Sequence, residues 1–230
     1  MRVLVVAAHP DDEVLGCGAT IARLTDAEHE VAILIVGEGA TSRRGSSEAT
    51  GEVARLRANA RLAAGDLGVR RLDLLGLPDN RLDTVPLLDI VHEIESIVDD
   101  VGPSVVFTHH PGDLNIDHAV VHRAVLTATR PLPGSVVERV ISFEVPSASE
   151  WSFHRLGPPF APNLFVDVSA TLDRKLEALA RYDTEARPAP HPRAPQSIRA
   201  AAVHRGAAAG LLAAEAFEVV RDVRGPSALI

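Results

Sequence analysis

The chain has 230 residues and a mass of 24.4 kDa, a length that suits one globular domain or two very small ones. Hydrophobic residues make up 46% of the chain and charged residues 23%, which excludes a largely disordered protein. The formal net charge of −8 disfavours a nucleic-acid binder that works by counterion release. The single cysteine, Cys17, excludes an internal disulfide and favours a reducing compartment.

The apolar runs are too short to cross a membrane. Those at residues 3–8 and 31–36 are strand-length and fall far below the roughly 20 residues of a membrane helix. The first run is followed at once by Pro10 and three acidic residues, which does not resemble a signal peptide. We therefore expect a cytoplasmic protein with neither a membrane nor a nucleic-acid partner.

Strand-like and helix-like patterns alternate along the first half of the chain. Continuous apolar runs, typical of strands buried on both faces, occur at residues 2–8, 31–36, 72–75 and 104–108. Helical patterns follow them at residues 13–27, 48–67, 85–101 and 118–129. This alternation predicts an α/β fold with a Rossmann-like, mostly parallel sheet and helices on both faces.

The second half is less regular. It contains strand-like runs at residues 137–144, 164–168 and 217–223, and helical patterns at residues 170–182 and 197–214. Residues 184–195 hold four prolines and are expected to form an extended loop, either a lid or an oligomer contact. We expect one domain over residues 1–230, with a core α/β half at 1–130 and a C-terminal elaboration at 131–230.

Polar residues follow three of the predicted strands at the point where each strand ends. His9, Asp11 and Asp12 follow the first strand, Asp79 follows the third, and residues 109–118 follow the fourth. In open parallel sheets, ligands bind outside the carboxyl ends of the strands. The sequence therefore predicts a functional site at this edge of the sheet.

The segment Ala-His-Pro-Asp-Asp-Glu at residues 8–13 indicates metal binding. Crowding three carboxylates costs free energy unless a positive charge compensates them. Imidazole and carboxylate together suit zinc, which takes three protein ligands in catalytic sites and keeps one position open. A polar loop that caps the following helix, with Asp11 or Asp12 at the N-cap, is the alternative, and the two interpretations are compatible.

A third ligand is expected from residues 109–118, where His118 begins a predicted helix. Of His109 and His110, we expect one to point into the site and the other to pack beside it. His122 is interpreted as an ordinary helix histidine, and Asp79 on residue type alone is a turn residue.

The two polar segments resemble the motifs of a known family. Residues 8–13 resemble the opening motif of the LmbE-like (PIG-L) family of zinc-dependent N-deacetylases, and Asn-Ile-Asp-His at residues 115–118 resembles its second motif, His-x-Asp-His. The resemblance covers about residues 1–195. It implies one Zn²⁺ per chain, held by His9, Asp12 and His118.

The resemblance also implies roles for neighbouring residues. Asp11 would be the general base that acts on the hydrolytic water. Asp117 would orient a neighbouring imidazole. Asp79 and Arg57 would contact the substrate.

Asn115 departs from the family pattern, because the family usually has a histidine there that assists the tetrahedral intermediate and the leaving amine. Asparagine can donate a hydrogen bond to an oxyanion but cannot supply a proton. We therefore expect Asn115 to contact the substrate, and Asp11, His110 or His191 to supply the proton. His110 is taken as the candidate catalytic histidine, and Asp117 would lack its usual partner.

The resemblance implies a hydrolase that removes an acetyl group from an N-acetylated sugar or glycoconjugate. Two alternatives stay open. The first is an amidase acting on a thiol–sugar conjugate. The second is a non-catalytic sugar- or nucleotide-binding protein of the same fold, an alternative that Asn115 supports. The resemblance also leaves room for a homo-oligomer.

Overall fold

The computed structural model describes residues 1–40, 49–183, 185 and 187–223. The strands are β1 (Arg2–Ala7), β2 (Glu30–Gly37), β3 (Arg71–Leu77), β4 (Val105–His109), β5 (Arg139–Phe143), β6 (Leu164–Asp167) and β7 (Ala214–Asp222). The helices are α1 (Asp12–Asp26), α2 (Ala49–Asp66), α3 (Leu87–Val101), α4 (Ile116–Ala128), α5 (Ala148–Trp151), α6 (Leu172–Leu179) and α7 (Pro195–Ala208), with a 3-10 turn, η1 (Leu82–Thr84).

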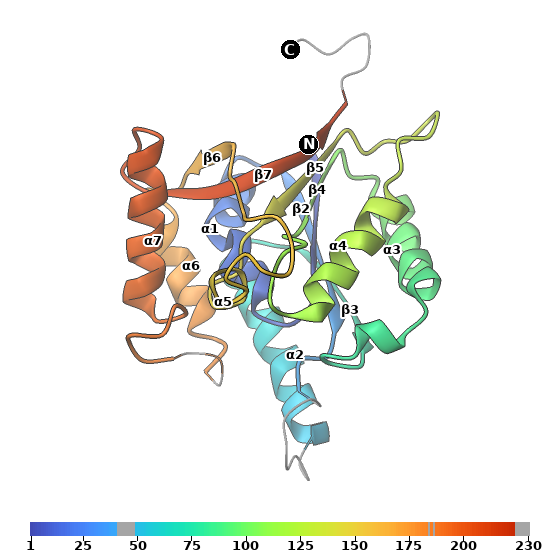
Figure 1. The fold of residues 1–230 in the computed structure, drawn as a ribbon, viewed down its shortest axis with the longest axis horizontal. Helices are drawn as coiled ribbons and strands as arrows, with labels where there is room; N and C mark the ends of the chain where they lie inside the picture. The colour runs from blue at the N-terminus through green and yellow to red at the C-terminus, as the bar shows by residue number, and fades with distance from the viewer. Residues whose placement is uncertain (41–48, 184, 186, 224–230) are drawn as a thin grey trace.

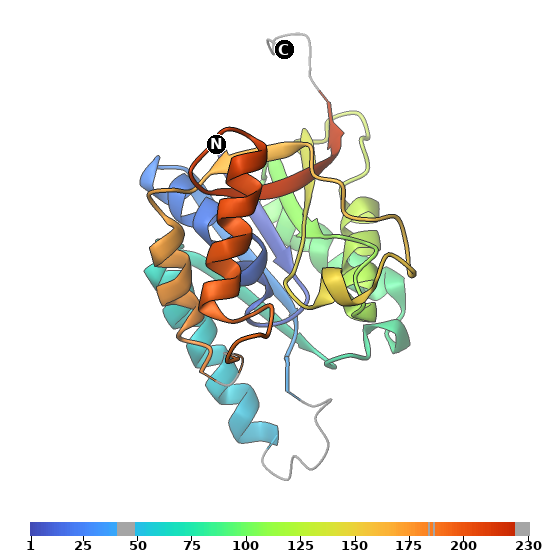
Figure 2. The same cartoon turned by 60° about the vertical axis from the view of Figure 1, so that its left-hand side comes forward.

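One seven-stranded sheet organises these elements, in the order β3-β2-β1-β4-β5-β7-β6. Strands β1 to β5 pair in parallel, and β7 runs antiparallel to both β5 and β6. Figures 1 and 2 show α1, α6 and α7 on one side of this sheet and α3 and α4 on the other. The expected Rossmann-like, mostly parallel α/β fold is confirmed.

The strand order reverses between β1 and β4. From β1 the chain proceeds outward through β2 and β3 on one side, and it returns through β4 and β5 on the other. Loops that leave neighbouring strands in opposite directions open a crevice at their carboxyl ends, where ligands bind in such sheets. His9 follows β1 and His109 ends β4, so both lie at this crevice.

Strand β1 is buried on both faces, as its continuous apolar run predicts. Val3 and Val5 belong to a cluster formed with α1, α2 and α6. Leu4 and Val6 belong to a second cluster formed with α3 and α4. Because side chains alternate along a strand, the two clusters hold β1 from opposite sides. The end of β1, and therefore the segment that begins at His9, is anchored in the core.

Helix α1 is interrupted at Cys17, which has the non-helical angles φ −143° and ψ 22°. The backbone N–H groups of Ala19 and Thr20, just after the break, donate to the Glu215 carboxylate at 3.1 and 2.7 Å. Lys175 pairs with the same carboxylate at 2.6 Å, and both side chains are buried. Residues from α6 and β7 therefore stabilise the break in the helix that follows the segment at residues 8–13.

Some predicted boundaries differ from the structure. The last predicted helix, at residues 197–214, ends as α7 at Ala208, because Gly210 adopts a left-handed conformation with φ 73°. Residue 214 already begins β7. The short elements η1 and α5 were not predicted. The first residue of the predicted helix at 48–67 lies outside the described residues, as do two residues of the expected loop at 184–195.

None of the helices in the described ranges is long and apolar enough to cross a membrane.

Candidate metal centre and active site

The segment between β1 and α1 makes a tight turn. Its backbone is held by two hydrogen bonds to the Asp11 carbonyl, from Val14 at 3.1 Å and Leu15 at 2.8 Å. The backbone N–H of His9 donates to Asp12 Oδ2 at 3.0 Å. Asp11 itself has a φ of 111°, which is strained for a residue with a side chain. The turn thus places His9, Asp11 and Asp12 together at the end of the sheet.

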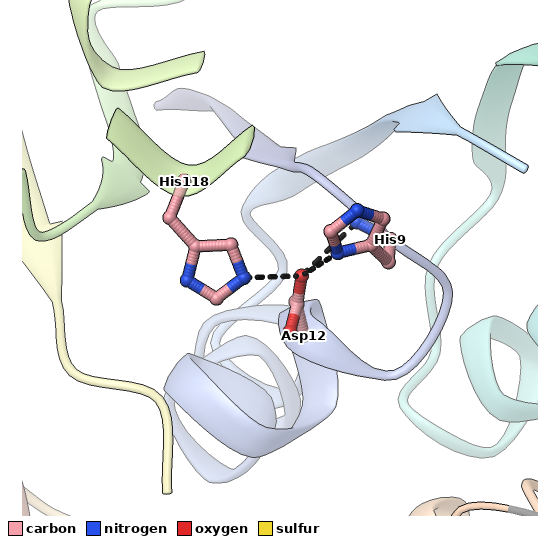
Figure 3. A group of neighbouring side chains, drawn as sticks. All are labelled: His9, Asp12 and His118. Carbon is pink, nitrogen blue, oxygen red and sulfur yellow. Dashed lines mark hydrogen bonds and ion pairs between the residues drawn. The ribbon is translucent and has the colours of Figure 1, made fainter. Parts of the chain in front are cut away.

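Three of the expected residues bring ligand atoms together. His9, Asp12 and His118 each offer one atom, and these atoms all lie within 4.8 Å of one another. Asp12 Oδ2 lies 3.2 Å from His9 Nδ1 and 3.3 Å from His118 Nε2. Figure 3 shows both rings directed toward this carboxylate, although the two histidines lie 109 positions apart in the sequence. All three residues are buried.

The outward nitrogen of each imidazole is held by a second carboxylate. His9 Nε2 lies 2.8 Å from Asp117 Oδ2, and His118 Nδ1 lies 2.8 Å from Asp113 Oδ2. A carboxylate at one ring nitrogen fixes the tautomer, so the other nitrogen presents a lone pair. The nitrogens left for a metal are His9 Nδ1 and His118 Nε2, the same two that face Asp12. This donor set of two imidazoles and one carboxylate fits Zn²⁺.

The two supporting carboxylates are themselves anchored. Asp117 Oδ1 accepts the backbone N–H of Leu82 at 2.9 Å. Asp113 Oδ1 accepts the hydroxyl of Ser149 at 2.6 Å. Asp117 thus contacts an imidazole, that of His9, in place of the usual partner that it was expected to lack because Asn115 replaces the family's histidine. Asp113 was not identified in the sequence, where it resembles an ordinary residue of a Pro-Gly-Asp turn.

The carboxylates give the centre a strong preference for positive charge. Burial lowers the pKa of His9, but hydrogen bonds to Asp117 and Asp12 and the nearby Asp79 raise it to about 10. Burial raises the pKa of Asp12, but His118 and His9 hold it well below its usual value. A divalent cation at this position would supply the charge that the carboxylates favour.

Asp11 lies beside this centre with a different environment. It is 3% exposed, and its Oδ2 accepts a hydrogen bond from Arg193 Nη1 at 2.8 Å. Burial raises the pKa of Asp11 well above its usual value, although the Arg193 charge opposes this. Arg193 was not predicted as a site residue, since 182 positions separate it from Asp11.

A small polar cavity of about 140 Å³ opens onto the centre. Asp79 and Asn115 line it together with Asp11 and the three candidate ligands. Asp79 Oδ1 lies 3.3 Å from His9 Nε2 and accepts the side-chain amide of Asn80 at 3.0 Å. Asn115 caps α4, where its Oδ1 accepts the Asp117 N–H at 2.9 Å, and its NH₂ group is the part that can donate.

Two of the expected site residues lie elsewhere. His110 has Nδ1 at 3.0 Å from Glu218 Oε2 and Nε2 at 3.0 Å from the Pro158 carbonyl, so it fastens the loop before β6 to β7. It does not line the cavity. Arg57 lies against Gly76 in β3, where a Cβ atom would come within 2.4 Å of its Nη2, and it is likewise absent from the cavity lining.

Of His109 and His110, it is His109 that lies beside the candidate metal centre. Its ring stacks on His118 with centroids 3.9 Å apart, and its Nε2 accepts the backbone N–H of Ala8 at 2.7 Å. Burial holds the pKa of His109 well below its usual value, as does the adjacent His118. His109 therefore packs against the candidate ligand His118, and His122 donates to its carbonyl at 2.8 Å.

Residues 4–129 match the model of the PIG-L family, described as GlcNAc-PI de-N-acetylase. This match includes both polar segments and covers more than half of the chain. The chain belongs to the PIG-L family. The resemblance seen in its motifs is thereby confirmed.

Curated members of the PIG-L family match over most of their length. The uncharacterized deacetylase YaiS of Escherichia coli is 30% identical over 186 residues, which are 78% of this chain and 89% of that protein. A probable N-acetyl-alpha-D-glucosaminyl L-malate deacetylase 2 of Bacillus cereus is 30% identical over 192 residues, covering 80% of this chain and 84% of that protein.

Solved structures show the same fold. The 4-carboxy-2-hydroxymuconate hydratase GalB of Pseudomonas putida superposes with a TM-score of 0.78 at 21% identity, over 100% of this chain and 99% of that one. Since that enzyme is named for hydration, the PIG-L fold alone does not determine the reaction. The site and the family match therefore have to indicate the reaction.

Proposed function

We propose that this protein is a metal-dependent hydrolase that removes the acetyl group from an N-acetylated sugar or glycoconjugate. The observation that carries the proposal is the convergence of His9, Asp12 and His118 on one point, with Asp11 beside them on the same cavity. Membership of the PIG-L family and relatives named as deacetylases of N-acetylated sugars support the choice of bond and substrate class.

His9, Asp12 and His118 would hold the metal, and zinc is the ion that their donor set favours. A bound Zn²⁺ supplies Lewis acidity, which lowers the pKa of a water molecule toward about 7 and polarises the amide carbonyl. The role of Asp113 and Asp117 is to hold the two imidazoles in the ligating orientation, through the 2.8 Å contacts on their outward nitrogens.

Asp11 is the proposed general base. Its carboxylate takes the proton from water as the oxygen attacks the acetyl carbon. The amide C–N bond then breaks to give acetate and a free amine. Of the three groups expected to return the proton to the leaving nitrogen, Asp11 lines the cavity, whereas His110 and His191 do not. We therefore assign both proton transfers to Asp11.

The cavity also suggests how a sugar would be held. Asp79 offers carboxylate oxygens that can accept hydrogen bonds from sugar hydroxyls, and Asn115 offers an NH₂ group to the developing oxyanion. Both residues line the cavity. Arg57 packs against Gly76 and does not line the cavity. In this proposal it could contact only a part of the substrate that extends outside the cavity. We propose a reducing, cytoplasmic compartment because Cys17, the single cysteine of the chain, is a buried free thiol.

Acetate release from N-acetylglucosamine and its glycosides by the zinc-loaded protein tests the proposal, with the chelated protein as a control. Acetate released only in the presence of metal supports it. Turnover of an amide carrying a thiol-containing acyl group, without turnover of acetamides, would favour the amidase alternative. Stoichiometric zinc with no turnover of either amide would favour a binding protein.

A further inference from the structure

Asp11 has a positive φ, a strained backbone conformation that the surrounding residues must stabilise. Its φ of 111° lies in a region that residues with a Cβ rarely occupy, and such strain persists only where the surroundings impose it. Two residues of the C-terminal part of the chain support Asp11. Tyr182 acts on its backbone through Glu13, and Arg193 contacts its carboxylate directly.

The backbone contact passes through Glu13. The N–H of Asp11 donates to Glu13 Oε2 at 3.0 Å, and the hydroxyl of Tyr182 donates to Glu13 Oε1 at 2.6 Å. Glu13 is 1% exposed and Tyr182 is fully buried. With a partner on each oxygen, the Glu13 carboxylate has little freedom to rotate, so the Asp11 N–H has a fixed acceptor.

The side-chain contact comes from Arg193. Its Nη1 donates to Asp11 Oδ2 at 2.8 Å, while its Nε donates to Ser147 Oγ at 3.1 Å and lies 3.3 Å from the Pro146 carbonyl. The planar guanidinium therefore bridges Asp11 to the segment that leads into α5, and a lysine could not make both contacts in the same geometry.

We infer that Tyr182 and Arg193 are positioning residues for Asp11, which together hold its carboxylate in the orientation that takes the proton from water. The inference rests on the proposed function. Both residues lie outside residues 4–129, the part that matches the family model, so this task falls to the C-terminal part of the chain. Small displacements of a reacting group cost up to about 100-fold in rate.

A double-mutant cycle on kcat tests whether Arg193 acts through Asp11. Arg193→Ala is expected to lower kcat for acetate release by about 10- to 100-fold, with KM and zinc content close to those of the wild type. In the Asp11→Asn background, the same substitution should cost less than about threefold, because the carboxylate that it positions is already gone. An equal loss in both backgrounds would overturn the inference.

Three further measurements separate positioning from general stability. Millimolar guanidinium should restore part of the kcat of Arg193→Ala and none of that of Asp11→Asn. Tyr182→Phe, which removes one hydroxyl, should lower kcat and leave zinc content unchanged. Arg199→Ala is the matched control, since Arg199 is an exposed arginine that pairs with Asp173, and it should retain wild-type kcat. A loss of kcat in Arg199→Ala equal to that in Arg193→Ala would contradict the assignment.

A cycle of melting temperatures gives a readout that does not depend on activity. If the contact exists in solution, the shifts of Arg193→Ala and Asp11→Asn should fail to add by more than about 2 °C in the metal-free protein. Additive shifts would overturn the contact, whatever the substrate. Absence of acetate release by the wild type would instead refute the proposed function and would leave this thermal result standing.

Discussion

Removing the carboxylate of Asp113 should weaken zinc binding although Asp113 is not proposed as a ligand. Its Oδ2 holds His118 Nδ1 at 2.8 Å, and its Oδ1 accepts the Ser149 hydroxyl at 2.6 Å. In Asp113→Ala, nothing fixes the proton on Nδ1, so the His118 ring can rotate or present the protonated nitrogen to the metal. The perturbation therefore acts on the metal through the orientation of one ligand.

The expected size follows from the geometry. Loss of a carboxylate behind a ligating histidine costs about 10- to 100-fold in metal affinity, which is about 1.4–2.7 kcal/mol. The buried Ser149 hydroxyl also loses its acceptor, a cost of about 1–3 kcal/mol that appears in the free energy of unfolding. Asp113→Asn keeps one acceptor oxygen for His118 Nδ1 and places an NH₂ donor beside the Ser149 hydroxyl. Its zinc affinity should therefore fall by less than that of Asp113→Ala.

Competition with a chromogenic zinc chelator measures the dissociation constant, and thermal melting of the metal-free protein reports the separate cost to stability. Asp73→Ala serves as the matched control, because Asp73 is a partly exposed aspartate that pairs with Arg71 in β3. If Asp113→Ala bound zinc as tightly as the wild type, the orientation argument for His118 would be refuted.

The other predictions concern the remaining site residues and the core. Asp11→Asn should bind one zinc per chain and lose about 10²-fold or more in kcat; unchanged turnover would show that Asp11 is not the base. His118→Ala should lose the metal, as measured by atomic absorption after gel filtration, and full occupancy would contradict the ligand set. His110→Ala should leave kcat unchanged, whereas a loss comparable to that of Asp11→Asn would restore it as a catalytic candidate. Gly16→Ala should destabilise the protein by about 1–3 kcal/mol in denaturant unfolding, because its Cβ would lie 2.3 Å from Phe143 Cδ2; wild-type stability would refute that steric argument.

The sheet was predictable because local signals along the chain agreed with one another. Strands buried on both faces give continuous apolar runs, and four such runs with helical patterns between them predicted the order of the first strands and helices. The insertion of β7 between β5 and β6 was not predictable, because no pattern within β7 states which strand it will pair with. The end of α7 was misplaced because an Ala-rich segment continues past Gly210, and only the left-handed conformation there ends the helix.

The site residues that lie within one motif could be predicted from the sequence. Those contributed by distant parts of the chain could not. His9 and Asp12 lie three positions apart in one turn, so their proximity follows from the sequence. Arg193 contacts Asp11 from 182 positions away. The proline-rich segment around Arg193 contains no pattern that predicts this contact. The choice of His110 over His109 had no basis in residue type, because both are histidines. Strand alternation sends their side chains to opposite faces, and His109 is the one that stacks on His118.

The two adjacent aspartates of the turn illustrate how one short segment can serve two roles. Asp12 faces imidazoles, and His118 and His9 hold its pKa well below its usual value despite burial, which suits a permanent anionic ligand. Asp11 is equally buried, but among the described contacts its carboxylate has one partner, Arg193, and burial raises its pKa. Neighbouring acids whose environments move their pKa values apart are those that divide ligation and proton transfer between them. The opposite directions of the two pKa shifts are consistent with the proposed roles, in which Asp12 is a ligand and Asp11 transfers the proton.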